Sequence, residues 1–137
     1  MGRIIIDAGP LVALLDTDDQ FHAWAKLAIS PLDPPLTTCD AVLSEACFRL
    51  SSHGSAISKL RQLVERGILV SDFNSHGKLP AVFALMAKYA DVPMSFADAC
   101  LVCMVEDNQG ATVLTADSHF TIYRQQRRQL IPLIAPF

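Results

Sequence analysis

The sequence predicts a single α/β domain with a mostly parallel, five-stranded sheet that is covered by helices on both faces. Three observations predict it: the chain has 137 residues, half of them are apolar, and short β-branched runs alternate with helical patterns throughout. A chain of this length fits one domain of ordinary size. Alternation of strands with helices is typical of parallel sheets. We therefore interpret residues 1–137 as one domain.

Five short apolar runs are expected to form the strands. The first contains Ile4, Ile5 and Ile6 and ends at Asp7, as a fully buried strand does. The last contains Pro132, which cannot donate a backbone hydrogen bond, so we expect this strand at an edge of the sheet. The expected strands are residues 3–6, 36–38, 68–73, 112–115 and 130–135.

Apolar residues at helical spacing and local capping signals predict the helices. Gly9-Pro10 is expected to end the first strand. Asp40 and Ser95 are expected to cap the helices that follow them, and Gly67 is expected to end the helix before it. Asp18 or Asp19 is expected to cap the helix whose buried face carries Phe21, Trp24, Leu27 and Ala28. The expected helices are residues 11–16, 20–30, 40–50, 55–66, 80–89 and 95–107, with a short helical turn at 118–124.

Composition excludes several classes of protein. No run of about 18 apolar residues is present, so we expect no membrane span. The net charge of −3 gives no basic field of the kind that attracts nucleic acid. We interpret the cysteines as buried free thiols in a reducing cytoplasm, and the C-x-x-C pair as part of a helix core rather than a zinc site. The four are Cys39, Cys47, Cys100 and Cys103.

Four acidic residues lie where a core is expected. Asp7 and Asp117 follow predicted strands, and ligands of open parallel sheets bind outside the carboxyl ends of the strands. Glu45 and Asp98 lie in helices among apolar neighbours, and neither is expected on a plainly solvated face. A buried carboxylate without a partner costs several kcal/mol, so these positions need an explanation.

Each acid also has a structural explanation. Asp7 and Asp117 can cap the helices that follow them, Glu45 can pair with Arg49 one turn later, and Asp98 lies near a helix start where the dipole favours negative charge. A single metal site explains all four acids at once. Hard cations such as Mg²⁺ and Mn²⁺ prefer oxygen ligands and bridge an acidic pocket to a phosphate group. Hydrolysis of a phosphodiester is then the expected reaction.

At these residues the sequence resembles the PIN-domain nucleases, specifically the VapC type of toxin–antitoxin ribonuclease. The matching stretches follow one another in the expected order at residues 4–16, 18–25, 42–46, 95–99 and 114–120. The resemblance implies a three-layer α/β/α sandwich and one or two Mg²⁺ or Mn²⁺ ions, bound by Asp7, Glu45, Asp98 and Asp117. Thr115 matches a small hydroxyl residue of the same pocket. Ser95 stands where many relatives carry a further acid, which leaves the number of ions open.

The resemblance also implies partners: an RNA substrate, a second copy of the chain in a homodimer, and a small antitoxin protein. Phe21 and Trp24 can belong to the antitoxin groove, to the dimer contact or, more commonly, to the core. Arg124, Arg127 and Arg128 either contact phosphates or form a solvated face. The predicted function is a metal-dependent endoribonuclease. The alternative is a non-catalytic PIN-like module that binds RNA or acts as a scaffold, for which the loss of one acid would be the sign.

Overall fold

A computed structural model describes residues 2–137 of the chain and confirms the predicted architecture. Five strands form one sheet in the order β3-β2-β1-β4-β7, and every neighbouring pair is parallel. The strands are β1 (Ile4–Ile6), β2 (Leu36–Thr38), β3 (Leu69–Ser71), β4 (Thr112–Leu114) and β7 (Leu133–Ile134). As predicted, the strand after Pro132 lies at an edge.

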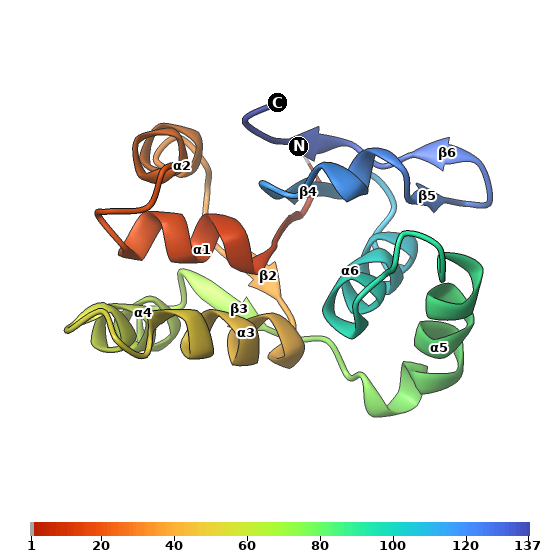
Figure 1. The fold of residues 1–137 in the computed structure, drawn as a ribbon, viewed down its shortest axis with the longest axis horizontal. Helices are drawn as coiled ribbons and strands as arrows, with labels where there is room; N and C mark the ends of the chain where they lie inside the picture. Colours follow the sequence, from red (N-terminus) through yellow and green to blue (C-terminus); the bar gives the residue numbers. More distant parts are fainter. Residues whose placement is uncertain (1) are drawn as a thin grey trace.

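Helices cover both faces of this sheet, which gives three layers (Figure 1). Helices α1 to α4 lie on one side and α5 and α6 on the other, with the strands between them. The helices are α1 (Ala8–Leu15), α2 (His22–Ile29), α3 (Asp40–Leu50), α4 (Ala56–Glu65), α5 (Leu79–Lys88) and α6 (Phe96–Asp107), with short 3-10 turns η1 (His76–Lys78) and η2 (Ser118–Thr121). No helix of residues 2–137 is long and apolar enough to cross a membrane.

The pairing of the central strands determines which strand ends lie next to each other. Strand β1 pairs with β2 on one side and β4 on the other, and Ile6 lies opposite Leu114. Both strands are fully buried at these positions, because the β-branched and apolar run presents side chains to helices on both faces. The carboxyl ends of β1 and β4 therefore lie side by side, and the residues that follow them meet at one edge of the sheet.

Some predicted helix ends are wrong by a few residues. Helix α1 begins at Ala8, so Pro10 lies in its first turn, where a missing backbone N–H costs nothing. Asp40 is the first residue of α3 and not its cap, because Cys39 with its extended backbone takes the cap position; the Asp40 carboxylate instead accepts a hydrogen bond from Ser71 Oγ at 2.6 Å. Ser95 does cap α6, and Gly67, with φ of +72°, follows α4 as predicted.

The predicted buried face of residues 20–30 is partly wrong. Helix α2 begins only at His22, and neither Asp18 nor Asp19 caps it, since Asp19 Oδ1 instead accepts from Phe21 N in the preceding turn. Ala25 is the buried residue of α2, whereas the side chain of Leu27 is 77% exposed. The face that packs on the core carries Trp24, Ala25, Ala28 and Ile29, and at about 100° per residue this places Leu27 on the opposite, solvated side of the helix.

Two further features of residues 2–137 differ from the expectation. The predicted helical turn at 118–124 is present as η2, but the small antiparallel hairpin that follows it, of β5 (Arg124–Gln125) and β6 (Gln129–Leu130), was not predicted. Arg124 donates to three carbonyl oxygens of the preceding turn and so has a structural role. All four cysteines are free thiols, but Cys47 is exposed and not buried, because it lies on the outer face of α3.

Candidate active site

Asp7 lies at the point where β1 turns into α1. Its Oδ1 accepts a hydrogen bond from the backbone N of Ala8 at 2.7 Å, so the capping role considered from the sequence is present. Its Oδ2 accepts a hydrogen bond from Thr115 Oγ1 at 2.8 Å. The side chain is only 6% exposed. Asp7 is thus a carboxylate held in a fixed position at the carboxyl edge of the sheet.

Thr115 couples the acids that follow the two central strands. Its hydroxyl donates to Asp7 and accepts from the backbone N of Asp117 at 3.0 Å. Asp117 caps η2, since its Oδ1 accepts from the backbone N of His119 at 2.9 Å, and the His119 ring Nδ1 lies 3.3 Å from the same oxygen. His119 therefore faces this acidic group.

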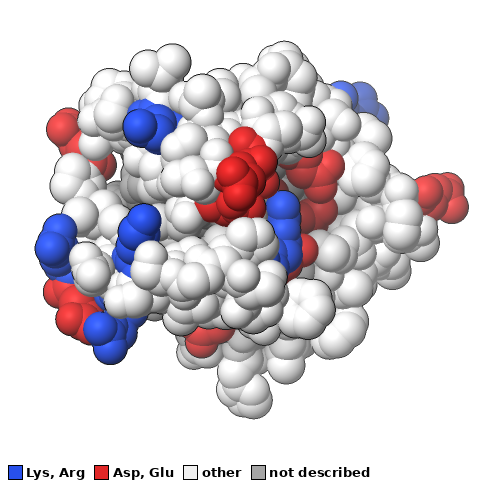
Figure 2. Space-filling model, turned by 60° about the vertical axis from the view of Figure 1, so that its left-hand side comes forward, with Lys and Arg blue, Asp and Glu red and all other residues white. Residues whose placement is uncertain are grey.

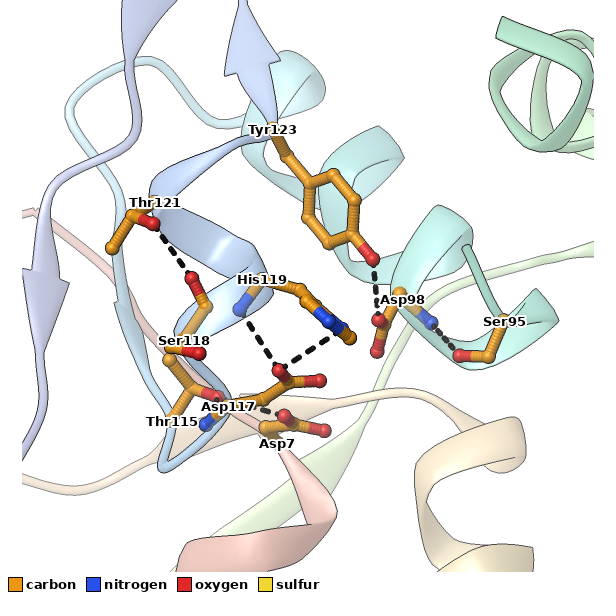
Figure 3. Close-up of polar contacts among 9 residues, drawn as sticks. All are labelled: Asp7, Ser95, Asp98, Thr115, Asp117, Ser118, His119, Thr121 and Tyr123. Carbon is orange, nitrogen blue, oxygen red and sulfur yellow. Dashed lines mark hydrogen bonds and ion pairs between the residues drawn. The ribbon is translucent and has the colours of Figure 1, made fainter. Parts of the chain in front are cut away.

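Asp98 is the third residue of α6, and its position is set from two directions. Ser95 Oγ accepts a hydrogen bond from the backbone N of Asp98 at 3.0 Å, and the hydroxyl of Tyr123 donates to Asp98 Oδ2 at 2.9 Å. Figure 3 shows Asp7, Asp98 and Asp117 pointing toward one another from three different elements. Tyr123 was missed by the sequence interpretation, because nothing local marks it as the partner of an acid 25 residues away.

Glu45 differs from the other three acids. It lies on α3 and lines the same cavity, but its side chain is exposed, so the expectation that it avoids a solvated face is wrong. Phe48, an apolar neighbour of Glu45 on the helix, is itself 81% exposed. No ion pair between Glu45 and Arg49 is found in residues 2–137, so the simple structural explanation for this acid is not observed.

These side chains line one cavity of about 570 Å³. We call the buried acids Asp7 and Asp98 its floor, and the side chains of Phe21, Glu45 and Arg49, nearer solvent, its rim. Figure 2 shows acidic side chains gathered in the middle of one face and partly recessed, with a basic side chain beside them. The full lining is Asp7, Gly9, Asp19, Gln20, Phe21, Glu45, Arg49, Pro93, Ser95, Asp98, Ala116, Asp117, Ser118 and His119.

Burial and mutual repulsion raise the pKa of the floor carboxyls. Burial is the largest cause for Asp7, followed by the charge of Asp98, and together they raise its pKa to about 7 despite the hydrogen bonds from Thr115 and Ala8. Burial likewise raises the pKa of Asp98, the charge of Asp117 adds to this, and the Tyr123 hydroxyl opposes it. A raised pKa means that the ionised form of these carboxyls is disfavoured, and a bound cation would stabilise that form.

The donor chemistry of the cavity fits Mg²⁺ or Mn²⁺, because carboxylate oxygens dominate it. Within residues 2–137, no three His, Cys, Asp or Glu side chains form a cluster able to surround an ion by themselves. Mg²⁺ is usually held by one or two carboxylates together with water and substrate phosphate. The carboxylates of this cavity would therefore be sufficient to hold such an ion together with water and substrate phosphate.

The rim contains residues that the sequence interpretation missed or assigned elsewhere. Phe21 was expected to pack in the core, yet its half-buried ring lines the cavity, whereas Trp24 does pack against the core. Arg49 was considered only as a partner of Glu45. The spacing of four residues places Glu45 and Arg49 on one face of α3. This spacing could have indicated that Arg49 lines the same cavity as Glu45.

The comparisons with known proteins agree with this geometry. The family model of the PIN domain matches residues 4–125. The crystal structure of VapC20 from Mycobacterium tuberculosis, described as a toxin that cleaves the sarcin–ricin loop, has a TM-score of 0.74; the match covers 87% of this chain and 93% of that chain at 19% identity, so it shows a shared fold. No curated protein matches the chain. Since the match to the family model spans most of the chain and includes all four acids, this protein belongs to the PIN-domain family.

Proposed function

We propose that this protein is a divalent-metal-dependent endoribonuclease that hydrolyses RNA phosphodiester bonds and acts as the toxin of a toxin–antitoxin pair. The observation that carries the proposal is the convergence of Asp7, Glu45, Asp98 and Asp117, from four distant segments, on one cavity. Membership of the PIN-domain family supports it. The fold shared with VapC20, a toxin that cleaves the sarcin–ricin loop, supports the choice of RNA and of a toxin role.

The four acids would hold one or two Mg²⁺ or Mn²⁺ ions. Tyr123 donates to Asp98 Oδ2, so the other oxygen, Oδ1, would be available to hold an ion. Thr115 holds Asp7 and the backbone of Asp117 at once and is a positioning residue in this proposal. When bound, the ion supplies an activated water molecule and neutralises charge on the reacting phosphate.

The floor and the rim act differently on the substrate. Asp7 and Asp98 are almost fully buried, so little bulk water reaches their carboxylates, which strengthens their attraction for a cation. The exposed Glu45 reaches the same space from the solvent side. A phosphodiester that enters from the rim therefore meets the cation site at the bottom of the cavity.

We further propose that the protein works in the cytoplasm as a homodimer and is held inactive by a small antitoxin. Exposed apolar side chains on α2 and α4, including Leu27, Ile57 and Val64, support the presence of a protein partner. Light scattering of the purified chain, alone and after co-expression with any short reading frame that lies beside its gene, measures both assemblies. A strictly monomeric chain would contradict the dimer.

The non-catalytic alternative is not favoured. A PIN-like module that only binds RNA or acts as a scaffold has no need of all four acids in one cavity, and here none is missing. The two possibilities differ in turnover, which the following experiment measures.

The test is cleavage of total cellular RNA with Mg²⁺, with Mn²⁺ and with EDTA. We expect cleavage by the wild-type chain only with metal, and none by Asp98→Asn, whose side chain still accepts the Tyr123 hydrogen bond. Asp33→Asn, a substitution of an exposed acid outside the cavity, is the matched control and should cleave normally. Failure of the wild-type chain to cleave with either metal, or cleavage by Asp98→Asn at the wild-type rate, contradicts the proposal.

A further inference from the structure

The cavity is larger than a metal site requires. Its volume of about 570 Å³ falls in the range of pockets that hold whole small molecules, about 300–1,000 Å³. The acids of the floor occupy one part of its lining. The turn between α1 and α2, with Gln20 and Phe21, and the outer half of α3, with Arg49, form another part.

Arg49 lies in an acidic cavity but forms no ion pair within residues 2–137. It follows Glu45 by four residues on α3, so it lies on the same helix face about 6 Å further from the end of β2. Arg49 is exposed, and it forms no ion pair with Asp7 or Asp98. A free, planar guanidinium group beside a phosphodiester site is suited to bind a phosphate group.

Phe21 is held in place by its own turn. Asp19 Oδ1 accepts a hydrogen bond from the backbone N of Phe21 at 2.8 Å, and His22 Nδ1 lies 2.7 Å from the carbonyl oxygen of Ala13 in α1. The ring meets Trp24 edge to face, with 6.3 Å between centroids and 76° between planes. Phe21 is half-buried and lines the cavity, so an ordered aromatic surface stands beside the acids.

An aromatic ring is not a ligand for a hard cation, which prefers oxygen ligands such as carboxylates. Proteins that recognise single-stranded RNA do use such rings, because an unpaired base stacks on an aromatic or guanidinium plane. We propose that Phe21 and Arg49 form a nucleotide subsite, in which Phe21 stacks on an unpaired base and Arg49 binds the phosphate group of the nucleotide next to the cleaved bond. This inference rests on the proposed ribonuclease function and adds that the cleaved RNA is single-stranded at this position.

The test uses the RNA fragment that the wild-type chain cleaves in total cellular RNA, as a substrate for steady-state kinetics. Loss of one stacked base is expected to raise KM about 5- to 100-fold in Phe21→Ala, with kcat little changed. Phe21→Trp keeps a stacking surface and should keep KM near that of the wild type. Phe21→Leu keeps apolar packing against Trp24 but has no ring, and should raise KM as Phe21→Ala does.

Arg49→Gln should also raise KM and should lower the dependence of log(kcat/KM) on log salt concentration by a slope of about 1, as expected for one lost phosphate contact. Phe48→Ala and Arg66→Gln are the matched controls, since both residues are exposed and lie outside the cavity lining. Both should leave KM and the salt slope unchanged.

The possible results separate the two proposals. A wild-type chain that cleaves no RNA overturns the proposed function and the subsite with it. Normal cleavage with an unchanged KM in Phe21→Ala and Arg49→Gln overturns the subsite alone. An unchanged KM in Phe21→Leu would show that the ring only packs the turn, and this too overturns the stacking role.

Discussion

The floor and the rim of the cavity both carry charged side chains, but in opposite surroundings. Asp7 and Asp98 are almost fully buried, each accepts a hydrogen bond from a hydroxyl group, and burial raises the pKa of both. Glu45 and Arg49 are exposed and have no such hydroxyl partners among residues 2–137. The difference teaches that the negative charge of the floor needs a cation to stabilise it, whereas the side chains of the rim remain accessible to a substrate.

The largest effect is expected at the floor. Asp98→Asn should lower cleavage by more than the roughly 10- to 100-fold that is typical of residues supporting a metal ligand. It should leave thermal stability unchanged or higher, because it removes a buried charge and keeps an acceptor for Tyr123. Cleavage rates and melting temperatures measure the two effects. Loss of activity together with a melting temperature several degrees lower would show that Asp98 mainly stabilises the fold.

The second prediction concerns pH in the metal-free protein. The pKa of Asp7 is about 7 in the folded chain and 3.8 without the fold, so the folded state keeps a proton that the unfolded state releases between these values. Stability should therefore fall as pH rises from about 4 to about 7, by on the order of 4 kcal/mol, and level off above.

Urea denaturation in EDTA across this pH range measures that fall. Asp7→Asn is the control, because it cannot titrate and should lose most of the slope. Equal pH dependence in the wild type and in Asp7→Asn would show that Asp98 and the other acids, not Asp7, carry the effect.

A smaller effect is expected behind the floor. Tyr123→Phe removes the hydroxyl that donates to Asp98 at 2.9 Å and leaves the ring in place. We expect a loss of about 1–3 kcal/mol of stability, since a buried carboxylate loses its donor, and a loss of cleavage of about 10-fold that higher Mg²⁺ concentration partly restores. Full activity at every Mg²⁺ concentration would show that Tyr123 does not position Asp98 for an ion.

The smallest effect is expected at the rim. Glu45→Gln should lower cleavage less than Asp98→Asn does, and should change the free energy of unfolding by no more than about 0.5 kcal/mol, as is usual at exposed positions. Parallel titrations of both variants with Mg²⁺ compare them directly. If Glu45→Gln is the more severe variant, the exposed acid and not the buried floor holds the ion most directly.

The sequence by itself determined the order of strands and helices and the ends of the strands that carry Asp7 and Asp117. It also identified Ser95 as a cap and α6 as a buried helix. These features follow from short-range patterns: β-branched runs, helical spacing and turn residues act within a few positions of the chain. Because parallel strands share one carboxyl edge, the meeting of Asp7 with Asp117 could be predicted as well.

Only the tertiary structure decided which side chains stand behind and around these acids. The bond from Tyr123 to Asp98, the exposure of Glu45 and the place of Phe21 and Arg49 in the cavity wall depend on how helices rotate and pack against the sheet. In α2, packing against the core buries Ala25 and leaves Leu27 exposed. Helix rotation is set by contacts between segments far apart in the chain, and local patterns carry no record of those contacts.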